Sequence, residues 1–278
     1  MAAAKGIVRI AVVACGLLPA LTLAADPVVL CPGQEVYPGL DGRLLGHLPY
    51  AEAPAADLVP APYGFGIGVA CRVQRDVLPD LTRLLAAAAA TPRVGSRLRA
   101  VSCFRSIAHQ RTVFCSQIGP RRRCRDAAER ALSVAPPAYS EHATGYAIDF
   151  GVRPSPGCGD VDPCMAATPA GQWLTAHARE FGFELSFPAG NPQGVTWEPW
   201  HWRWVGTNVA VPGAVKARLA FTRARTNFPA GPGIYEVSDY WLIPSDGVPV
   251  PSVAPPPPPY ITAPPTLSLL ERGAGRTP

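Results

Sequence analysis

Apolar positions follow a helical pattern most clearly in two stretches of the chain. Residues 77–90 place Pro79 in the first turn, where proline is tolerated, and end in a run of alanines, which favour helix. Residues 165–181 carry their large apolar side chains on a broadly shared side, and Gly182 follows as a C-terminal stop. Both stretches are therefore predicted to be amphipathic helices.

Shorter elements are predicted between and after these helices. Ser106 is placed to cap a helix over residues 107–114, and a second short helix over residues 126–132 ends before Pro136. Period-two alternation of large apolar residues with glycine predicts a strand over residues 63–69. Further strands are predicted over residues 97–102, 145–150, 183–185 and 202–205.

The mixture of helices and strands lacks the regular strand–helix alternation of a parallel sheet, so the predicted fold class is α+β. We expect a central antiparallel sheet flanked by helices in one domain with irregular N- and C-terminal extensions. A hydrophobic content of 48% and a charged content of 16% agree with a folded core. The predicted boundaries are a lead-in over 25–69, a domain over 70–209, an extension over 210–248, and a proline-rich, disordered tail over 249–278.

The first 24 residues have the features of a secretory signal peptide. Lys5 and Arg9 precede an apolar run over residues 10–23, and cleavage is expected after Ala24. Lipoprotein anchoring through Cys15 is an alternative. No later stretch is apolar and long enough to span a membrane. We therefore expect an exported protein of the periplasm, cell wall or extracellular space, without a membrane segment after signal removal.

Cysteine usage agrees with export, because an oxidising compartment would pair most of the cysteines that remain after Cys15 leaves. The chain contains no Cys-x-x-Cys pair, which argues against a zinc cluster built from cysteines. Sequence alone leaves the connectivity open. The plausible pairs are Cys158 with Cys164, Cys115 with Cys124, and Cys31 with Cys71, which leaves Cys103 as a buried apolar residue.

Two short clusters carry the chemistry of this chain. Residues 140–150 read Ser-Glu-His-Ala-Thr-Gly-Tyr-Ala-Ile-Asp-Phe, and residues 198–203 read Glu-Pro-Trp-His-Trp-Arg. Each contains one of only five histidines, beside a carboxylate. A catalytic zinc site uses three imidazole or carboxylate ligands and keeps a fourth position open. His142, Asp149 and His201 supply such a set.

The spacing within the first cluster requires a change of chain direction. Residues seven apart on a straight strand point to opposite faces, because side chains alternate. Gly145 permits a turn or bulge, so His142 can lie on the approach to the strand and Asp149 on the strand itself. His201 is then expected on the next strand. Three tryptophans of opposite parity, Trp200, Trp202 and Trp204, are expected to form core and cleft wall while His201 and Arg203 face the site.

Glu198 precedes His201 by three residues, with Pro199 between them. A tight turn would place this carboxylate next to the metal without making it a ligand. There it could take a proton from a zinc-activated water and pass it to the leaving amine, so we predict Glu198 as the general base and acid.

These motifs resemble a known family. Ser-x-His-x-x-Gly-x-Ala-x-Asp followed by Glu-x-Trp-His is similar to the zinc D-alanyl-D-alanine carboxypeptidases and dipeptidases, including the VanY-type enzymes. A third family motif, Tyr-Arg-Ser-x-x-x-Gln, has its counterpart at residues 104–110, with Phe104 in place of tyrosine. The resemblance covers roughly residues 70–205, and the wider group includes murein endopeptidases and the hedgehog signalling domain.

The resemblance implies a role for each matching residue. His142, Asp149 and His201 would hold one Zn²⁺ ion, and Glu198 would be the catalytic base and acid. The remaining positions would bind substrate: Arg105 at the terminal carboxylate or the developing oxyanion, with Ser140 and Gln110 adding polar contacts to the peptide. Phe104 removes one hydroxyl that relatives have.

The predicted function is therefore a zinc-dependent peptidase that acts on peptidoglycan stem peptides, as a D-alanyl-D-alanine carboxypeptidase. The alternatives are an endopeptidase that cuts a cross-link or the L-Ala–D-Glu bond, and a non-catalytic zinc-containing wall-binding module. We expect no nucleic-acid partner, and the oligomeric state stays open. Signal removal would lower the formal net charge from +5 to about +3, which suits an anionic wall or simple solubility.

Overall fold

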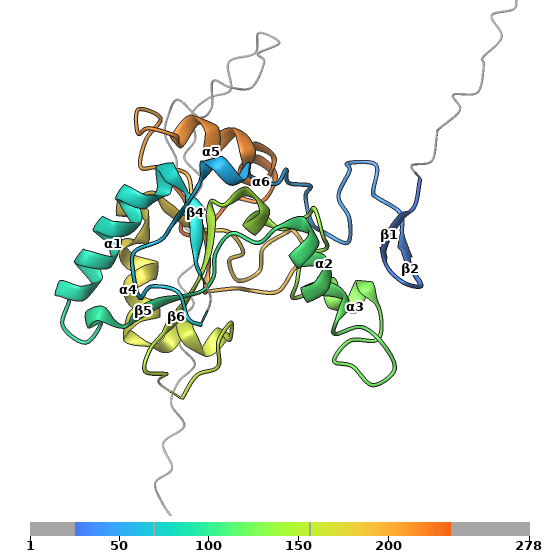
Figure 1. Cartoon of the computed structure of the whole chain (residues 1–278), viewed down its shortest axis with the longest axis horizontal. Coiled ribbons are helices and arrows are strands. Elements are labelled where there is room, and N and C mark those ends of the chain that lie inside the picture. The colour runs from blue at the N-terminus through green and yellow to red at the C-terminus, as the bar shows by residue number, and fades with distance from the viewer. Residues whose placement is uncertain (1–25, 69, 156, 235–278) are drawn as a thin grey trace, which may run out of the picture. The chain divides into compact units, whose positions relative to one another are not determined.

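The structure is a computed structural model that describes residues 26–68, 70–155 and 157–234 (Figure 1). The predicted signal peptide over 1–24 and the predicted tail over 249–278 lie outside the described residues, as does the extension after residue 234. None of the helices in the described part of the chain is long and apolar enough to cross a bilayer.

Short strands and short helices alternate irregularly along the chain. The strands are β1 (Val28–Cys31), β2 (Gln34–Val36), β3 (Leu58–Pro60), β4 (Arg72–Gln74), β5 (Leu98–Ser102), β6 (Ala147–Val152), β7 (Phe183–Leu185) and β8 (His201–Trp204). The α-helices are α1 (Leu78–Ala90), α2 (Ile107–Cys115), α3 (Ala127–Ala131), α4 (Pro169–His177), α5 (Ala214–Ala220) and α6 (Thr222–Asn227). The 3-10 helices are η1 (Ala55–Asp57), η2 (Arg75–Val77), η3 (Gly95–Arg97), η4 (Glu141–Thr144), η5 (Pro163–Ala167) and η6 (Ala178–Phe181).

The central sheet has four strands in the order β5-β6-β8-β7, and every neighbouring pair is antiparallel. Two smaller antiparallel pairs, β1 with β2 and β3 with β4, precede it in the chain. In Figure 1, α1 and α4 lie next to β5 and β6. The arrangement confirms the predicted α+β class with an antiparallel sheet flanked by helices.

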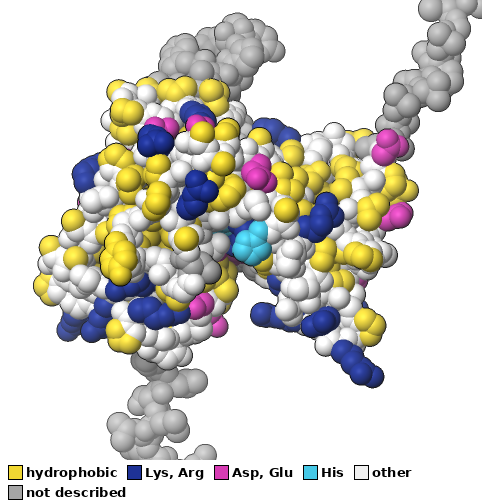
Figure 2. Space-filling view, in the orientation of Figure 1, with side chains coloured by type: hydrophobic (Ala, Val, Ile, Leu, Met, Phe, Trp, Pro, Cys, Tyr) yellow, Lys and Arg dark blue, Asp and Glu magenta, His cyan; other side chains and the backbone are white. Residues whose placement is uncertain are grey.

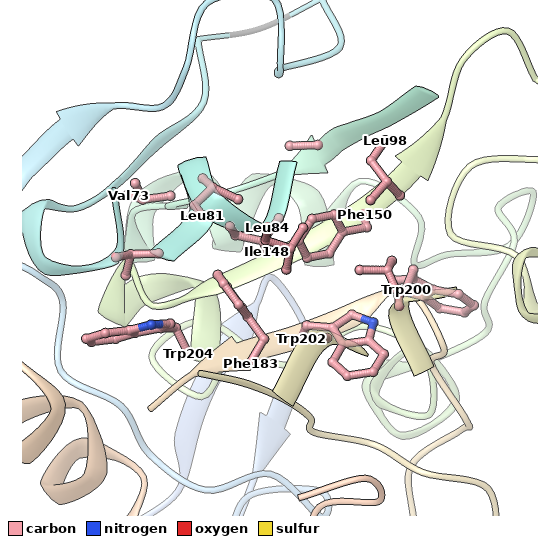
Figure 3. Close-up of a cluster of buried hydrophobic side chains, with 14 of the residues drawn as sticks. Val73, Leu81, Leu84, Leu98, Ile148, Phe150, Phe183, Trp200, Trp202 and Trp204 are labelled. Atoms are coloured by element: carbon pink, nitrogen blue, oxygen red, sulfur yellow. The ribbon is translucent and has the colours of Figure 1, made fainter. Parts of the chain in front are cut away.

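One face of the sheet is apolar because alternate residues of each strand point to the same side. Figure 3 shows Leu81 and Leu84 of α1 packed beside Ile148 and Phe150 of β6. The same buried cluster contains Leu98 of β5, Phe183 of β7, Trp202 and Trp204 of β8, and Trp173 and Leu174 of α4. Each fully buried large side chain contributes roughly 1.5–3 kcal/mol, so this layer supplies much of the driving force for folding.

The opposite face of the same strands is polar although it is also buried. Asp149 of β6 and His201 of β8 lie directly opposite each other in the ladder, and Glu184 of β7 lies opposite Arg203 of β8. All four side chains have relative exposures of 5% or less. Buried polar groups require hydrogen-bonding or ionic partners. The partners of these four side chains are described below, and they make this face the candidate site.

The strand predicted over residues 63–69 is wrong. Gly64 and Gly68 adopt positive φ values of 75° and 70°, which break an extended strand, and residue 69 lies outside the described residues. Phe65 and Ile67 nevertheless bond to the backbone of Ala100 in β5. The alternation of apolar residues with glycine therefore belongs to a segment that lies beside β5 and forms only an isolated bridge, between Gly66 and Ala100.

The helix predicted over residues 165–181 is interrupted. Thr168 accepts a hydrogen bond from the backbone of Gly171 and caps a new helix that begins at Pro169, because proline fits a first turn but cannot continue the preceding one. Gly182 ends the last turn in the left-handed region with φ 80°, as predicted. Helices α5 and α6 lie beyond residue 210, where the sequence pattern is too weak to predict them.

The disulfide pattern corrects two of the three pairs that sequence proximity suggested. Cys158–Cys164 is confirmed. The expected Cys115–Cys124 and Cys31–Cys71 pairs are wrong, and Cys103 is not a free cysteine. The structure instead joins Cys31 to Cys115 and Cys71 to Cys103, and leaves Cys124 as a buried free thiol.

Candidate active site and metal centre

The structure brings His142, Asp149 and His201 together on the polar face of the sheet. Their ligand atoms all lie within 4.8 Å of one another, and all three side chains are buried. His142 belongs to η4, which ends at Gly145 with φ 72°, so the chain turns before it enters β6. A Cβ atom at position 145 would lie 2.6 Å from Leu58 Cδ2, so the turn requires glycine for space as well as conformation.

The two imidazole rings converge on the carboxylate of Asp149. His142 Nε2 lies 3.0 Å from Asp149 Oδ2, and His201 Nδ1 lies 2.9 Å from Asp149 Oδ1. Each ring is held by its other nitrogen: His142 Nδ1 is 2.8 Å from the Cys103 carbonyl, and His201 Nε2 is 3.0 Å from Glu141 Oε2. Because each far nitrogen faces an acceptor, it can carry the proton of the neutral ring, and the converging nitrogen then offers its lone pair to a metal.

A donor set of two imidazoles and one carboxylate, with the far nitrogens oriented by a carbonyl and a carboxylate, fits a catalytic zinc site. Cys158, Asp162 and Cys164 also lie close together, but the two cysteines form a disulfide and their thiolates are not available. Within the described residues, the His142, Asp149 and His201 group is thus the better fit for a zinc ion.

Glu198 lies beside this centre without joining it. Its Oε2 is 3.9 Å from His201 Nδ1, and the backbone N–H of His201 donates to the Glu198 carbonyl at 3.0 Å, which closes the predicted turn. Burial raises the pKa of Glu198 to about 8. The charge of His201 acts to lower this pKa, and the negative charges of Asp149 and Glu141 act to raise it. A carboxyl with such a pKa can accept and release a proton near neutral pH.

Arg105 reaches the same centre from the segment that precedes α2. Its NH2 group lies 3.7 Å from Asp149 Oδ2 and donates to Ser102 Oγ at 2.7 Å. Its NH1 group donates to Gln110 Oε1 at 2.8 Å, and Gln110 Nε2 donates to the carbonyl of Ala135. Gln110 is therefore occupied at both ends, so its place in the structure is that of a support for Arg105.

Ser140 is likewise placed as a support. Its Oγ accepts from the backbone N–H of His142 at 3.4 Å and caps η4. The direct peptide contacts predicted for Ser140 and Gln110 stay predictions. All seven predicted site residues line one cleft of about 540 Å³, and Trp200 forms part of its wall as expected. Trp202 and Trp204 belong to the core instead.

Glu141 is the functional residue that the sequence reasoning missed. Its carboxylate is buried and forms hydrogen bonds with four side chains. Oε2 accepts from His201 Nε2 and Ser186 Oγ, and Oε1 accepts from Arg203 NH1 and Tyr50 OH. Burial alone would raise the pKa of Glu141, but Arg203 and His201 hold it below its usual value. The signal in the sequence was an acidic residue next to His142 inside a buried motif.

Arg203 lies on the same face of β8 as His201 but does not line the cleft. Its NH1 donates to Glu141 Oε1 at 2.8 Å, and its Nε donates to Glu184 Oε1 at 2.7 Å. The expectation that Arg203 faces the site is therefore corrected: Arg203 binds Glu141, the carboxylate that orients the His201 ring.

Replacing Glu141 with glutamine should lower the zinc affinity of the protein by about 10–100-fold. The amide cannot supply the charged acceptor that fixes His201 Nε2 and raises the basicity of the ring. Zinc dissociation constants from competition with a chelator would measure the effect. Glu180→Gln is a matched control, since Glu180 is exposed and binds only His177. Equal zinc affinities for the Glu141 variant and the wild type would contradict the assignment.

Comparison with known proteins agrees with the motifs. A family profile described as VanY, D-alanyl-D-alanine carboxypeptidase, matches residues 70–207. YodJ of Bacillus subtilis (strain 168) is 33% identical over 126 residues, which cover 44% of this chain and 43% of that protein. The D-alanyl-D-alanine carboxypeptidase of Enterococcus faecium is 36% identical over 81 residues, 28% of this chain and 23% of that protein. The chain thus spans less than half the length of these relatives.

A solved structure is also similar to this fold. The LdcB LD-carboxypeptidase, whose structure was described as revealing the molecular basis of peptidoglycan recognition, superposes with a TM-score of 0.50 at 26% identity. The superposition covers 63% of this chain and 81% of that one. The range that the family profile matches contains all seven predicted site residues, which are His142, Asp149, His201, Glu198, Arg105, Gln110 and Ser140. Through residues 70–207, this chain belongs to the VanY family of D-alanyl-D-alanine carboxypeptidases.

Proposed function

We propose that this protein is a zinc-dependent carboxypeptidase that removes the terminal D-alanine from peptidoglycan stem peptides ending in D-Ala-D-Ala. The observation that carries the proposal is the convergence of the ligand atoms of His142, Asp149 and His201 within 4.8 Å, with Glu198 beside them in one cleft. These three residues would hold one zinc ion. When bound, the ion would polarise the scissile carbonyl and lower the pKa of water to roughly 7.

Glu198 moves the proton in this proposal. Its carboxylate takes a proton from the attacking water as the new C–O bond forms at the scissile carbonyl. The same proton is then delivered to the nitrogen of the leaving D-alanine as the C–N bond breaks. The raised pKa of Glu198 supports this role, since the group can hold the proton between the two steps.

Arg105 positions the substrate. Its guanidinium is fixed by Ser102 and Gln110 and lies near Asp149, so it can hold the terminal carboxylate or the developing oxyanion without reorganising. A free terminal carboxylate is the mark of a carboxypeptidase substrate, which favours that activity over an endopeptidase. The presence of Glu198 beside intact ligands argues against a purely structural zinc site.

A second candidate is cleavage of the bond between an L residue and a terminal D residue. The likeness to the LdcB LD-carboxypeptidase favours it. We also propose that the protein is exported, to the periplasm or cell wall. The three disulfides among the described residues support this, because such bonds persist in oxidising compartments.

Three substrates would test the proposal: a peptide ending in D-Ala-D-Ala, a peptide ending in an L residue followed by D-Ala, and a cross-linked muropeptide dimer. Mass spectrometry of the products should show free D-alanine from the first peptide, with activity lost on chelation and restored by one equivalent of zinc. Cleavage confined to the second peptide would replace the proposal with the LD activity. No cleavage of any substrate by the zinc-loaded protein would reject it.

A further inference from the structure

The cleft has two walls of different charge. The acidic side chains that line it, Glu141, Asp149 and Glu198, all lie at the metal centre. A second wall is formed by α2, the loop before α3, α3 and the segment that follows α3, and it contributes Arg123 and Arg130 but no acidic side chain. Figure 2 shows basic side chains over α3 and the loop before it, at the lower right of the view. The cleft is therefore built to face negative charge on this second wall.

Arg130 is buried, with a relative exposure of 6%. Its NH2 group donates to the Val113 carbonyl at 3.0 Å, whereas its Nε has no hydrogen-bond partner. The neighbouring carboxylate of Glu129 binds Arg125 instead. Among the described residues no carboxylate pairs with Arg130. Burying a guanidinium without a carboxylate partner is unfavourable, so an anion that enters the cleft would offset that cost.

The surrounding charges add to this bias. Burial lowers the pKa of the Arg130 guanidinium. The neighbouring Cys124 side chain acts against this shift, and the positive charges of Arg123 and Arg105 act with it. Arg105 is engaged at the metal centre by its proximity to Asp149. Arg130 and Arg123 thus form a separate concentration of positive charge on the α2–α3 wall.

We propose that Arg130, with Arg123 beside it, forms a subsite that binds a second carboxylate of the substrate. The inference rests on the proposed function. A peptide that ends in D-Ala-D-Ala has one carboxylate next to the scissile bond, so a second one must belong to a residue on the amino-terminal side. The substrate class is therefore an acidic peptide, and a guanidinium is well shaped to bind its carboxylate through paired hydrogen bonds.

Two peptides that end in D-Ala-D-Ala and differ only upstream, one with a glutamate and one with the corresponding amide, test the subsite. The wild type should show a kcat/KM about 10–100-fold higher for the acidic peptide. Arg130→Gln should reduce this ratio to about one. Arg130→Lys should give an intermediate ratio. This variant keeps the charge and a hydrogen-bond donor, so it remains informative if folding needs the contact to the Val113 carbonyl. Arg125→Gln is the matched control and should keep the wild-type ratio, because Arg125 is exposed and pairs with Glu129.

Binding of the same two peptides in the Glu198→Gln background, measured by calorimetry, separates the subsite from catalysis. If the wild type cleaves neither peptide, but the acidic one binds at least tenfold tighter through Arg130, the proposed function fails and the subsite stands. Equal kcat/KM values in the wild type would overturn the subsite. An Arg130→Gln variant that keeps the wild-type ratio of kcat/KM values would also overturn it. So would an Arg130→Gln variant whose kcat/KM falls equally for both peptides, because that result would place Arg130 at the terminal carboxylate.

Discussion

Glu198→Gln should lower kcat for a D-Ala-D-Ala peptide by about 10²–10⁴-fold while the protein keeps its zinc. Glutamine has almost the same shape as glutamate but cannot accept the proton of the attacking water or deliver it to the leaving amine. Zinc binding should persist because Glu198 stands beside the metal centre, with its Oε2 3.9 Å from His201 Nδ1, and is not among the converging ligands. Steady-state kinetics together with zinc content per chain would measure both effects.

The matched control for this prediction is Glu35→Gln. Glu35 is an exposed residue of β2, so the same chemical change there should leave kcat unaltered. Retention of near wild-type activity by Glu198→Gln would show that another group moves the proton. A loss of zinc together with activity would place Glu198 among the ligands instead.

Arg203→Met should reduce the free energy of unfolding by about 3–5 kcal/mol at neutral pH. Arg203 is the shared partner of two buried carboxylates, with Glu141 on one side and Glu184 on the other. Methionine keeps much of the volume and the contact with Phe221, over whose ring the guanidinium lies at 5.3 Å. The expected loss therefore comes from buried negative charge that no longer has its main counter-ion. Urea denaturation of the zinc-free protein, compared with wild type, would measure it.

Arg125→Met is the matched control for Arg203→Met. Arg125 also pairs with a carboxylate, Glu129, but the two side chains are 86% and 36% exposed. Exposed ion pairs contribute about 0–1 kcal/mol. Similar losses for the two variants would show that the buried charges are not the reason for the destabilisation.

The buried ion network also connects the metal centre with parts of the chain outside the family range. Tyr50 of the N-terminal segment donates to Glu141, and Arg225 of α6 donates to Glu184. Tyr50 and Phe221 also pack edge to face, with their ring centroids 5.7 Å apart. These contacts cross the boundaries that the sequence suggests at residues 69 and 209. The orientation of His201 therefore depends on segments that precede and follow the matched domain.

Local chemistry explains why much of the molecule could be predicted. Helix caps such as Ser106, turn residues such as Gly182, and the alternation of tryptophans with His201 and Arg203 act between near neighbours in the chain. The same holds for the turn at Gly145 that separates His142 from Asp149. Residue type and spacing are therefore enough to suggest both the elements and the ligand set.

The sequence by itself determined the class of fold, the elements around the core and the residues able to bind a metal, because short-range sterics and donor chemistry decide these. Only the tertiary structure decided which cysteines pair, that Glu141 orients His201, that Gln110 supports Arg105, and that the buried Nε of Arg130 has no hydrogen-bond partner. Those features depend on which distant segments pack together. Residues 84 positions apart, such as Cys31 and Cys115, meet because burial of apolar surface brings β1 against α2, and no local pattern records that contact.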